Sequence, residues 1–550
     1  MNSSATLSAP ARPVRSGQAL RWAFCACVLA LAMYQFSENT ADPDLWTHTM
    51  LGEQSLLTHS IQRTEIYSWT ARGHPFVNHE VLAEAALGAS HLLLGGAGIL
   101  LLKILFGFLA FGIALRLGAE GLRWPERAFA WIIGAVAVVE ISFGFAARPQ
   151  IFTAVFLAVE FWVLRRIHRE KFWWALVLPA LYALWINTHG GVLAGLVVML
   201  TAAGTTTAQF LWQKFSRTKT EPFNVVTVSP KTAVVLCLSC VACFGAMFAN
   251  AWGFDLIRWI VGAVLWPRPE IEEWTPTRLG WDHAAVFYLM GFAAIAFLFS
   301  RRPRVLWEMA VCAVLAFFAL RSVRHTPLFS IAVLAFVPRH LADVFARYQA
   351  YFSRFEQMFR RGASQTLLTI VLGALSIGMA VATFTLHKEH PLTMEVPRNR
   401  YPVAAVAFMR EHDLRGNMLS FFDWGEMCLW ELPDCALSLD GRMDDCYPHE
   451  TILEHWNFYN DQPVDKQVLD IDRADVALLP CKLAGALALQ RRGWLPVYAD
   501  AVAVVLVRDP ALFPKLPREG LPVLGGAGAT TGRAAFPDAV CARVAQTKSR

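Results

Sequence analysis

The chain has 550 residues, of which 55% are hydrophobic and only 17% are charged. Soluble domains usually contain roughly 25% charged residues, so the composition excludes an ordinary soluble globular protein. Twenty tryptophans and 38 phenylalanines exclude disorder over most of the chain, because so much aromatic surface has to be buried. The net charge of +6 matches the excess of Lys and Arg in cytoplasmic loops and gives no reason to expect nucleic acid as a partner. The bulk of the protein is predicted to lie in a lipid bilayer.

Apolar runs of about 18 residues or more, the length needed to cross a bilayer, follow one another along the chain. They predict roughly eleven transmembrane helices, at 19–37, 96–117, 127–146, 149–166, 172–187, 189–212, 231–250, 284–300, 304–321, 326–343 and 366–387. The fifth run is short and prolines lie near several helix ends, so a re-entrant pair is an alternative there. The residues after the first run form a poor cleavage site, which indicates an uncleaved helix and not a signal peptide.

The loops between these helices alternate in basic charge. One set contains twenty Lys and Arg residues, whereas the other contains only Arg63, Arg72, Arg148, Arg258, Arg268, Arg278, Arg321 and Arg324. The positive-inside rule therefore places the first set and the N-terminus in the cytoplasm. With an odd number of spans, the C-terminal region is expected outside the cytoplasm.

Three segments on the non-cytoplasmic side are large. The first loop, 38–95, contains amphipathic stretches at 44–58 and 79–93 that suit the membrane surface, and a second loop covers 251–283. The tail from 388 reads as a small α/β layer. Its expected strands are 418–422, 436–440, 476–480, 495–498 and 501–507, and its expected helices are 401–413, 464–471 and 482–492. The predicted organisation is a membrane domain over 1–387, an extracytoplasmic α/β domain over 388–517 and a disordered end over 518–550.

The eleven cysteines give no metal motif. Cys237, Cys240 and Cys243 are regularly spaced, but they lie in an apolar helix with no His or Asp nearby, so no metal site is predicted there. Five further cysteines fall in the tail, where one or two disulfides are possible in an extracytoplasmic domain.

Two aspartates, Asp42 and Asp44, directly follow the first predicted span on the non-cytoplasmic side. Carboxylates at a membrane interface are costly unless they are used. Either could act as a general base on an acceptor hydroxyl or help hold a divalent cation, Mg or Mn. The alternative is that Asp44 only caps the helix that begins after it.

Later in the same loop, His79 and Glu80 could line the same pocket as the aspartates or bind a metal. Their spacing matches no standard zinc motif. Packing at the interface and capping of the 79–93 helix is the alternative role for this pair.

The motifs of this loop resemble those of a bacterial family of polytopic membrane proteins related to the GT-C glycosyltransferases. The resemblance is carried by the segments 42–48, 68–70, 78–80, 148–150, 185–191, 273–274, 324–327, 423–426 and 439–442. It covers most of the chain, although Thr47, Phe76 and Val81 replace three tryptophans that are usual in the family.

The resemblance implies a GT-C-like fold in the bacterial inner membrane and a polyprenyl-phosphate-linked sugar donor. The acceptor would be the hydroxyl of a glycan, lipid or protein. Asp44, or Asp42, would be the base of an inverting transfer. The leaving phosphate needs positive charge, for which Arg148, Arg258 and Arg324 are suited, although each could be a simple interface anchor. His189 and His325 lie at helix ends on the same side and are candidates for substrate binding or for structural roles.

Two other functions stay open at this level. Glu140, Glu160 and Glu308 lie within predicted spans, and intramembrane acids favour a transporter or flippase for a lipid-linked glycan. Loss of the usual tryptophans favours a non-catalytic scaffold with the same fold. In the tail, Asp440 and Arg442 follow a predicted strand and read as a binding position or as a local ion pair.

Overall fold

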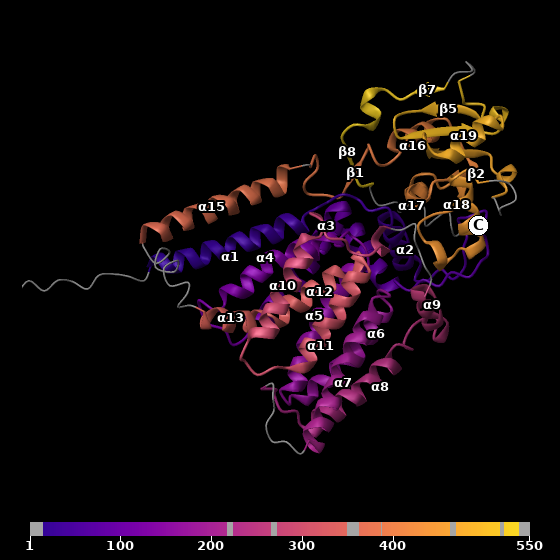
Figure 1. The fold of residues 1–550 in the computed structure, drawn as a ribbon. Helices are drawn as coiled ribbons and strands as arrows, with labels where there is room; N and C mark the ends of the chain where they lie inside the picture. Colours follow the sequence, from indigo (N-terminus) through magenta and orange to yellow (C-terminus); the bar gives the residue numbers. More distant parts are fainter. Residues whose placement is uncertain are drawn as a thin grey trace, which may run out of the picture.

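The computed structural model describes residues 15–216, 224–265, 272–348, 362–386, 388–462, 469–517 and 522–537. It has a large helical bundle with a smaller α/β region at one end (Figure 1). Expectations that concern Arg268, most of the 464–471 helix or the last thirteen residues lie outside the described residues.

Helices form at every apolar run found in the sequence. In the bundle and first loop they are α1 (Arg15–Phe36), α2 (Leu45–Thr58), α3 (Val81–Ala119), α4 (Ala128–Phe143), α5 (Gln150–His168), α6 (Val177–Ile186), α7 (Val192–Phe215), α8 (Pro230–Ala246), α9 (Phe254–Leu265), α10 (Ala284–Phe299), α11 (Leu306–Arg321), α12 (Thr326–Phe336), α13 (Pro338–Arg347) and α15 (Gly362–Thr385). A short 3-10 helix, Phe172–Leu176, leads into α6.

By length and composition, the described residues contain four helices able to cross a membrane. These are Gly17–Phe36, Val81–Ala119, Val192–Phe215 and Ala363–Thr385, and the pair Val323–Phe336 and Pro338–Arg347, bent by 53°, makes a fifth if it is one span. Several other apolar helices have only 10–17 residues. The total of eleven spans therefore stays a prediction.

The long helix α3 joins two elements that the sequence suggested separately. Its first part covers the predicted surface stretch 79–93 and its second part the predicted span 96–117, with a break at Gly95, where φ is +59°. A positive φ is accessible to glycine at little cost, so the chain can change direction here. The part before Gly95 packs against α2 so closely that a Cβ on Gly52 would lie 1.8 Å from the Glu84 carbonyl oxygen.

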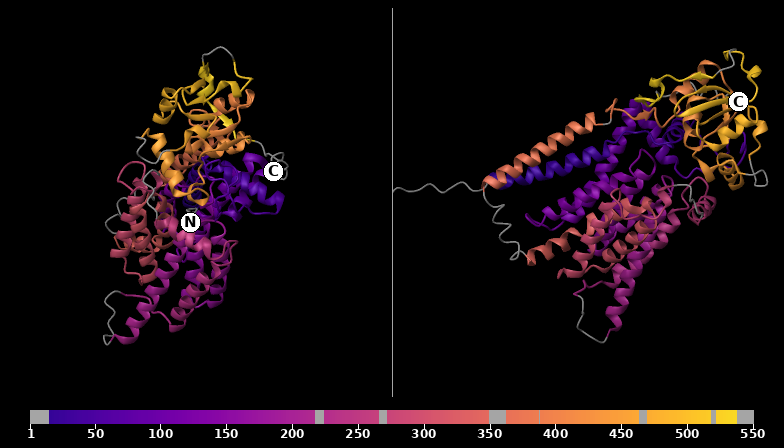
Figure 2. Two further views of the ribbon diagram at one scale, coloured as in Figure 1. Left: turned by 90° about the vertical axis from the view of Figure 1, so that its right-hand side faces the viewer. Right: turned by 45° about the horizontal axis from the view of Figure 1, so that its top comes forward.

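The centre of the bundle is α12, which is buried almost all round and packs against α3, α4, α5 and α11. A helix that is hydrophobic on every face suits such a central position. On one flank, α1 and α15 lie side by side along their lengths (Figure 2). Their outer faces are apolar and exposed, as expected of helices that contact lipid.

The α/β region is a six-stranded mixed sheet in the order β3-β2-β4-β6-β5-β7. The strands are β2 (Gly416–Ser420), β3 (Cys435–Leu437), β4 (Val476–Pro480), β5 (Leu495–Ala499), β6 (Ala503–Val507) and β7 (Val523–Leu524), and the helices are α16 (Val403–Glu411), α17 (Phe422–Glu431), α18 (His449–Tyr459) and α19 (Ala484–Arg491). β2 runs parallel to β3 and β4, whereas β6 runs antiparallel to both its neighbours. All five expected strands are present, but α17 and α18 were not expected. The tail cysteines among the described residues have free thiols.

The first loop is built into this α/β region. The segment before α2 bonds to β1 (Glu395–Pro397), with the Ala41 N–H donating to the Glu395 carbonyl at 2.7 Å. Ser68 pairs with Leu437 at the β3 edge of the sheet. Leu45, Trp46 and Leu87 share one hydrophobic core with the inner face of the sheet. The α/β region therefore has a fixed position over the first loop.

Part of the end of the chain is also ordered, in place of the disordered segment expected from residue 518. Residues 522–537 include β7 and β8 (Arg533–Ala535), and β8 pairs antiparallel with β1. Phe536 is only 4% exposed, with its ring 5.4 Å from Trp46 and 5.8 Å from Trp430. The glycine-rich sequence thus folds because other parts of the chain bind it.

Candidate active site

Asp42 and Asp44 meet at one arginine from another loop. Arg148, between α4 and α5, donates from Nε to Asp42, and its Nη1 lies 3.2 Å from Asp44 Oδ2. The same Nη1 lies 3.6 Å from an oxygen of Glu273. Asp44 precedes α2, but its side chain makes no capping hydrogen bond, so the simple capping role is not what the structure has. The two aspartates and Arg148 form one partly buried cluster, with 15–27% of each side chain exposed.

The environment of this cluster shifts proton affinities. Burial raises the pKa of Asp44, the charge of Arg148 opposes this, and the nearby charge of Asp42 adds to it. Burial lowers the pKa of Arg148, but the charges of Asp44 and Asp42 outweigh burial and raise it well above its usual value. Arg148 therefore stays charged, and Asp44 is more basic than an aspartate in water.

A second group of charged residues begins one helical turn after Asp44. His48 Nδ1 lies 3.4 Å from Glu84 Oε1 and 3.7 Å from Glu80 Oε2. Burial disfavours the charged imidazole, but the hydrogen bond to Glu84 and the charges of Glu80, Glu84 and Glu426 raise the pKa of His48 to about 10. Burial raises the pKa of Glu80 to about 7 against the opposing charge of His48. His48 is thus a cation between two acids at neutral pH.

Glu80 also faces two other histidines of the predicted site. One of its oxygens lies 3.4 Å from His79 Nε2 and 3.8 Å from His189 Nε2. His189 Nδ1 accepts the Gly191 N–H at 2.9 Å, so the neutral ring carries its proton on Nε2, toward Glu80. Burial and the charge of Arg324 lower the pKa of His189 well below its usual value. His189 is therefore a neutral hydrogen-bond donor.

The three predicted arginines differ in position. Arg324 lies over the ring of Trp274 at 5.3 Å, and its charge acts on Glu80 and His189, which places it beside the site. Arg258 is exposed, with its guanidinium over the ring of Phe254. The loop charge pattern that selected Arg258 therefore did not predict its distance from the aspartates.

His325 and Trp259 complete the comparison between the predicted and the observed positions. The ring of His325 lies against Phe318 of α11 at 5.7 Å and is not brought into the carboxylate cluster. In place of Arg258, its neighbour Trp259 reaches the site, with its ring 4.5 Å from that of His79.

The α/β region adds residues that sequence reasoning did not connect to the first loop. A Cβ built on Gly441 would lie 2.9 Å from Asp44 Oδ1 and 2.6 Å from Glu426 Oε1. Asp445 Oδ1 lies 3.7 Å from His79 Nδ1. The only signal in the sequence was that these residues fall within or near the tail motifs at 423–426 and 439–442.

A buried ion network holds the 440–445 loop in place. Arg442 donates to both oxygens of Asp440, at 2.8 and 2.7 Å, and its Nη1 lies 2.6 Å from Glu65 Oε2 in the first loop. Tyr447 donates to Asp440 at 2.7 Å. Since Asp440 and Glu65 are 0% exposed, this network fixes the α/β region to the first loop.

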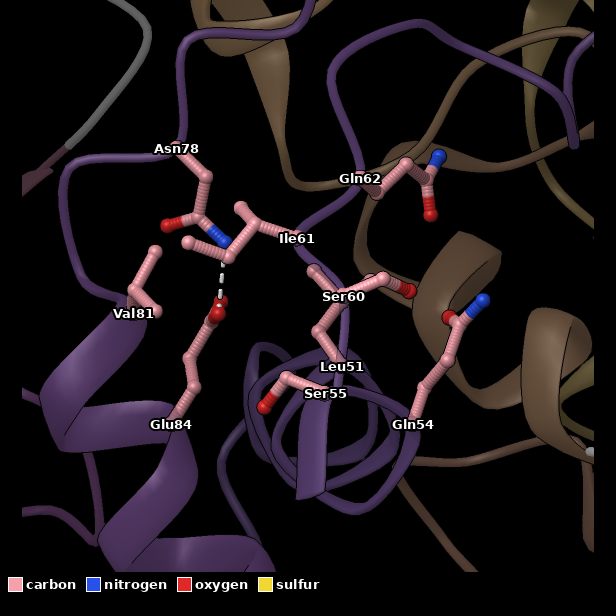
Figure 3. Close-up of a pocket in the computed structure, with 9 residues that line it drawn as sticks. All are labelled: Leu51, Gln54, Ser55, Ser60, Ile61, Gln62, Asn78, Val81 and Glu84. Carbon is pink, nitrogen blue, oxygen red and sulfur yellow. Dashed lines mark hydrogen bonds between the residues drawn. The ribbon is translucent and has the colours of Figure 1, made fainter. Parts of the chain in front are cut away.

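A small pocket lies beside Glu84 (Figure 3). Its walls are Leu51, Gln54, Ser55, Ser60, Ile61, Gln62, Asn78, Val81 and Glu84. Asn78 donates to Glu84 at 2.5 Å, and the other oxygen of Glu84 faces His48. Among the described residues, no group of three or more His, Cys, Asp or Glu is arranged to hold a metal ion.

Comparisons with known proteins give a similar structure but no relative by sequence. No family model matches the sequence, and no curated protein matches it. The chain is similar to the crystal structure of ArnT from Cupriavidus metallidurans bound to undecaprenyl phosphate, with a TM-score of 0.46 and 13% identity over 89% of this chain and 98% of ArnT. It is also similar to the apo structure of the same ArnT, with a TM-score of 0.48 and 13% identity over 91% and 99% of the two chains.

Proposed function

We propose that the protein is a membrane glycosyltransferase that transfers a sugar from a polyprenyl-phosphate carrier to an acceptor hydroxyl outside the cytoplasm. The observation that carries this proposal is the cluster in which Arg148 contacts both Asp42 and Asp44. A base and a phosphate-binding cation are the two groups that such a transfer needs at one place. The motif resemblance to GT-C-related proteins supports the same reaction.

In the proposed step, the acceptor oxygen attacks the anomeric carbon of the donor sugar. The bond from that carbon to the phosphate oxygen breaks, and polyprenyl phosphate leaves with the bonding electrons. The acceptor proton moves to a carboxylate oxygen of Asp44, and the anomeric configuration inverts. Arg148 and Arg324 are the cations suited to the leaving phosphate, since a guanidinium can donate two parallel hydrogen bonds to it.

Orientation is part of the proposal. The N-terminus would lie in the cytoplasm of a bacterial cell, the helical region 1–387 in the inner membrane and the α/β region 388–517 in the periplasm. The candidate site would then lie at the outer surface of the membrane, where a lipid-linked sugar and an extracytoplasmic glycan, lipid or protein acceptor could both reach it. Whether Mg or Mn is needed is tested by adding a chelator to the transfer assay.

The test compares sugar transfer by the wild type, Asp44→Asn and Asp42→Asn in membranes supplied with labelled polyprenyl-phosphate sugars. Asn keeps the size of Asp but cannot accept the proton, and loss of a general base typically slows a reaction by about 10²–10⁴-fold. Asp255→Asn is the control, because Asp255 is exposed in the first turn of α9. Transfer that is unchanged in both Asn variants at normal protein levels would remove the aspartates from the chemistry.

A transporter or flippase of lipid-linked glycans is the second candidate, and one observation favours it. Glu140, inside α4, is only 1% exposed. The nearest cation candidate is His283, at 3.8 Å. Buried acids of this kind are typical of proton-coupled transport. Flipping of a labelled lipid-linked glycan by reconstituted protein, lost in Glu140→Gln and kept in Asp44→Asn, would favour this function.

A further inference from the structure

The motif at 423–426 lies in α17, which packs against α2 (Figure 1). Glu426 is only 3% exposed, and its Oε2 accepts the backbone N–H of Thr47 at 3.3 Å. Thr47 is in the first turn of α2, three residues after Asp44. An acid from the α/β region is thus fixed at the start of the helix that follows the proposed base.

The space between the two acids exists because residue 441 has no side chain. The Cβ position of Gly441 lies 2.6 Å from Glu426 Oε1 and 2.9 Å from Asp44 Oδ1. Both oxygens therefore approach the same point from different elements. Two neighbouring carboxyl groups repel each other when both are ionised, so protonation of one of them is favoured.

The surrounding charges decide which acid is protonated. Burial raises the pKa of Glu426 well above its usual value; the charges of Asp44 and Asp440 add to this, and those of His48 and Arg442 oppose it. Arg442 is engaged by Asp440 and Glu65, and His48 by Glu80 and Glu84. Asp44, in contrast, has Arg148 at 3.2 Å. The proton therefore belongs to Glu426 and the negative charge to Asp44.

We propose that Glu426 is a positioning residue whose carboxylic acid donates a hydrogen bond to Asp44 Oδ1 across Gly441, leaving Asp44 Oδ2 to take the acceptor proton. This inference rests on the proposed function. A hydrogen bond to the ionised form favours that form, so Asp44 stays a carboxylate despite its burial. In the transfer step the acceptor O–H bond breaks, its proton goes to Asp44, and Glu426 keeps its own proton.

The kinetic test uses Glu426→Gln and Glu426→Leu. Gln offers a carbonyl to Thr47 and an N–H to Asp44, whereas Leu fills the space and offers neither. The acid limb of kcat/KM reports protonation of the base. We expect this limb to move up by about one pH unit in the Leu variant, the size of effect expected when a charged group loses a hydrogen bond, and to stay in place in the Gln variant. Glu431→Gln in the same helix is the control, because Glu431 pairs with the exposed Arg410. Equal acid limbs in wild type, Gln and Leu would overturn the proposal.

A second measurement does not depend on activity. The infrared difference spectrum between wild type and Glu426→Gln at neutral pH should contain the C=O stretch of a protonated carboxylic acid. The spectrum of Asp44→Asn, which still contains Glu426, should keep this band. If the difference shows a carboxylate instead, Glu426 is ionised and the inference is wrong, even if transfer occurs. If the acid band is present but the wild type transfers no sugar, the proposed function fails and the protonation of Glu426 stands. Because this comparison needs only the isosteric Gln variant, it decides the question even if the Leu variant does not fold.

Discussion

Replacing Arg442 by Met tests how the α/β region is fixed to the first loop. Arg442 is 4% exposed and contacts two acids, Asp440 and Glu65, which are 0% exposed. Met keeps most of the length of the side chain and removes its charge and donors. Both acids then remain buried without a counter-charge.

The size of the expected loss of stability follows from the hydrogen bonds that each acid keeps in the variant. Removing one partner of a buried ion pair costs about 3–5 kcal/mol. Asp440 retains the hydroxyl of Tyr447 at 2.7 Å, and Glu65 retains the backbone N–H groups of Tyr67 and Ser68 at 2.5 and 2.7 Å. These remaining donors place the expected loss at the lower end, about 3 kcal/mol.

The pH dependence gives the sharper test. Burial raises the pKa of Asp440, but the charge and hydrogen bonds of Arg442 outweigh burial and hold the pKa below its usual value. In the wild type this stabilisation is present above pH ~3.9, the pKa of unfolded Asp, and is lost as the pH falls through the folded value. In Arg442→Met the sign reverses, because the counter-charge is lost and burial, opposed only by the Tyr447 hydroxyl and the backbone N–H of residue 442, raises the pKa of Asp440. The variant should therefore regain stability as the pH falls through this raised pKa.

The assay is native-state proteolysis of purified protein in detergent at increasing urea, with release of the α/β region as the readout. The matched control is Arg410→Met, since Arg410 pairs with Glu431 at 2.8 Å but is 63% exposed. A pair of that kind contributes about 0–1 kcal/mol. Two results would refute this account of the ion network. One is that Arg442→Met loses no more stability than the control, and the other is that its loss of stability relative to wild type increases as the pH falls.

Three other predictions test separate features. Phe536→Ala should destabilise the α/β region by about 3–5 kcal/mol, measured by the same proteolysis, because the ring is 4% exposed and contacts three aromatic rings; a loss below about 1 kcal/mol would mean that this end does not pack as described. His48→Gln should lower the melting temperature at pH 6. The difference from wild type should shrink as the pH rises through about 10, because the folded pKa of His48 is raised to that value. An equal difference at both pH values would contradict a charged His48 in the folded protein. Gly88→Ala should reduce the yield of folded protein, because its Cβ would lie 2.4 Å from the backbone nitrogen of Glu53, whereas Gly112→Ala, which meets nothing within 4 Å, should fold normally.

The helices of the bundle could be predicted because their signal is local. A run of apolar residues needs no knowledge of its neighbours to indicate a helix in a bilayer. Helix α17 has no such signal, since it has ten residues and contains Gly425. That glycine is needed because a Cβ there would lie 2.6 Å from the Cα of Asp440, a contact between residues that are distant in sequence. The order of residues 522–537 likewise depends on β1, more than 130 residues earlier.

The same difference between local and long-range signals applies to the candidate site. Charge alternation among the loops selected arginines on one side of the membrane, which specifies a depth but not a position around the bundle. For this reason the prediction included both arginines near the acids, Arg148 and Arg324, and one that is not near them, Arg258. His48 and Glu426 were not selected as site residues, although they lie within the motifs at 42–48 and 423–426. The packing of α2 against α3 brings His48 to Glu84, and the packing of α17 against α2 brings Glu426 to the start of α2.

The charge of the cluster bears on how a donor would bind. Five acids lie around three cations, the acids being Asp42, Asp44, Glu80, Glu84 and Glu273 and the cations Arg148, His48 and Arg324. With every acid ionised, this excess of negative charge opposes a phosphate, although Arg148 and Arg324 are suited to hold one. Burial raises the pKa of Glu80 to about 7, so Glu80 can be neutralised near physiological pH. Protonation of Glu80 would lessen the repulsion of the phosphate. It would also remove a negative charge that competes with the phosphate for Arg324. The pKa of Glu80, which the charge of Asp44 helps to raise, would then set how strongly a phosphate donor binds, whereas the protonation of Asp44 would set the rate of the proposed transfer.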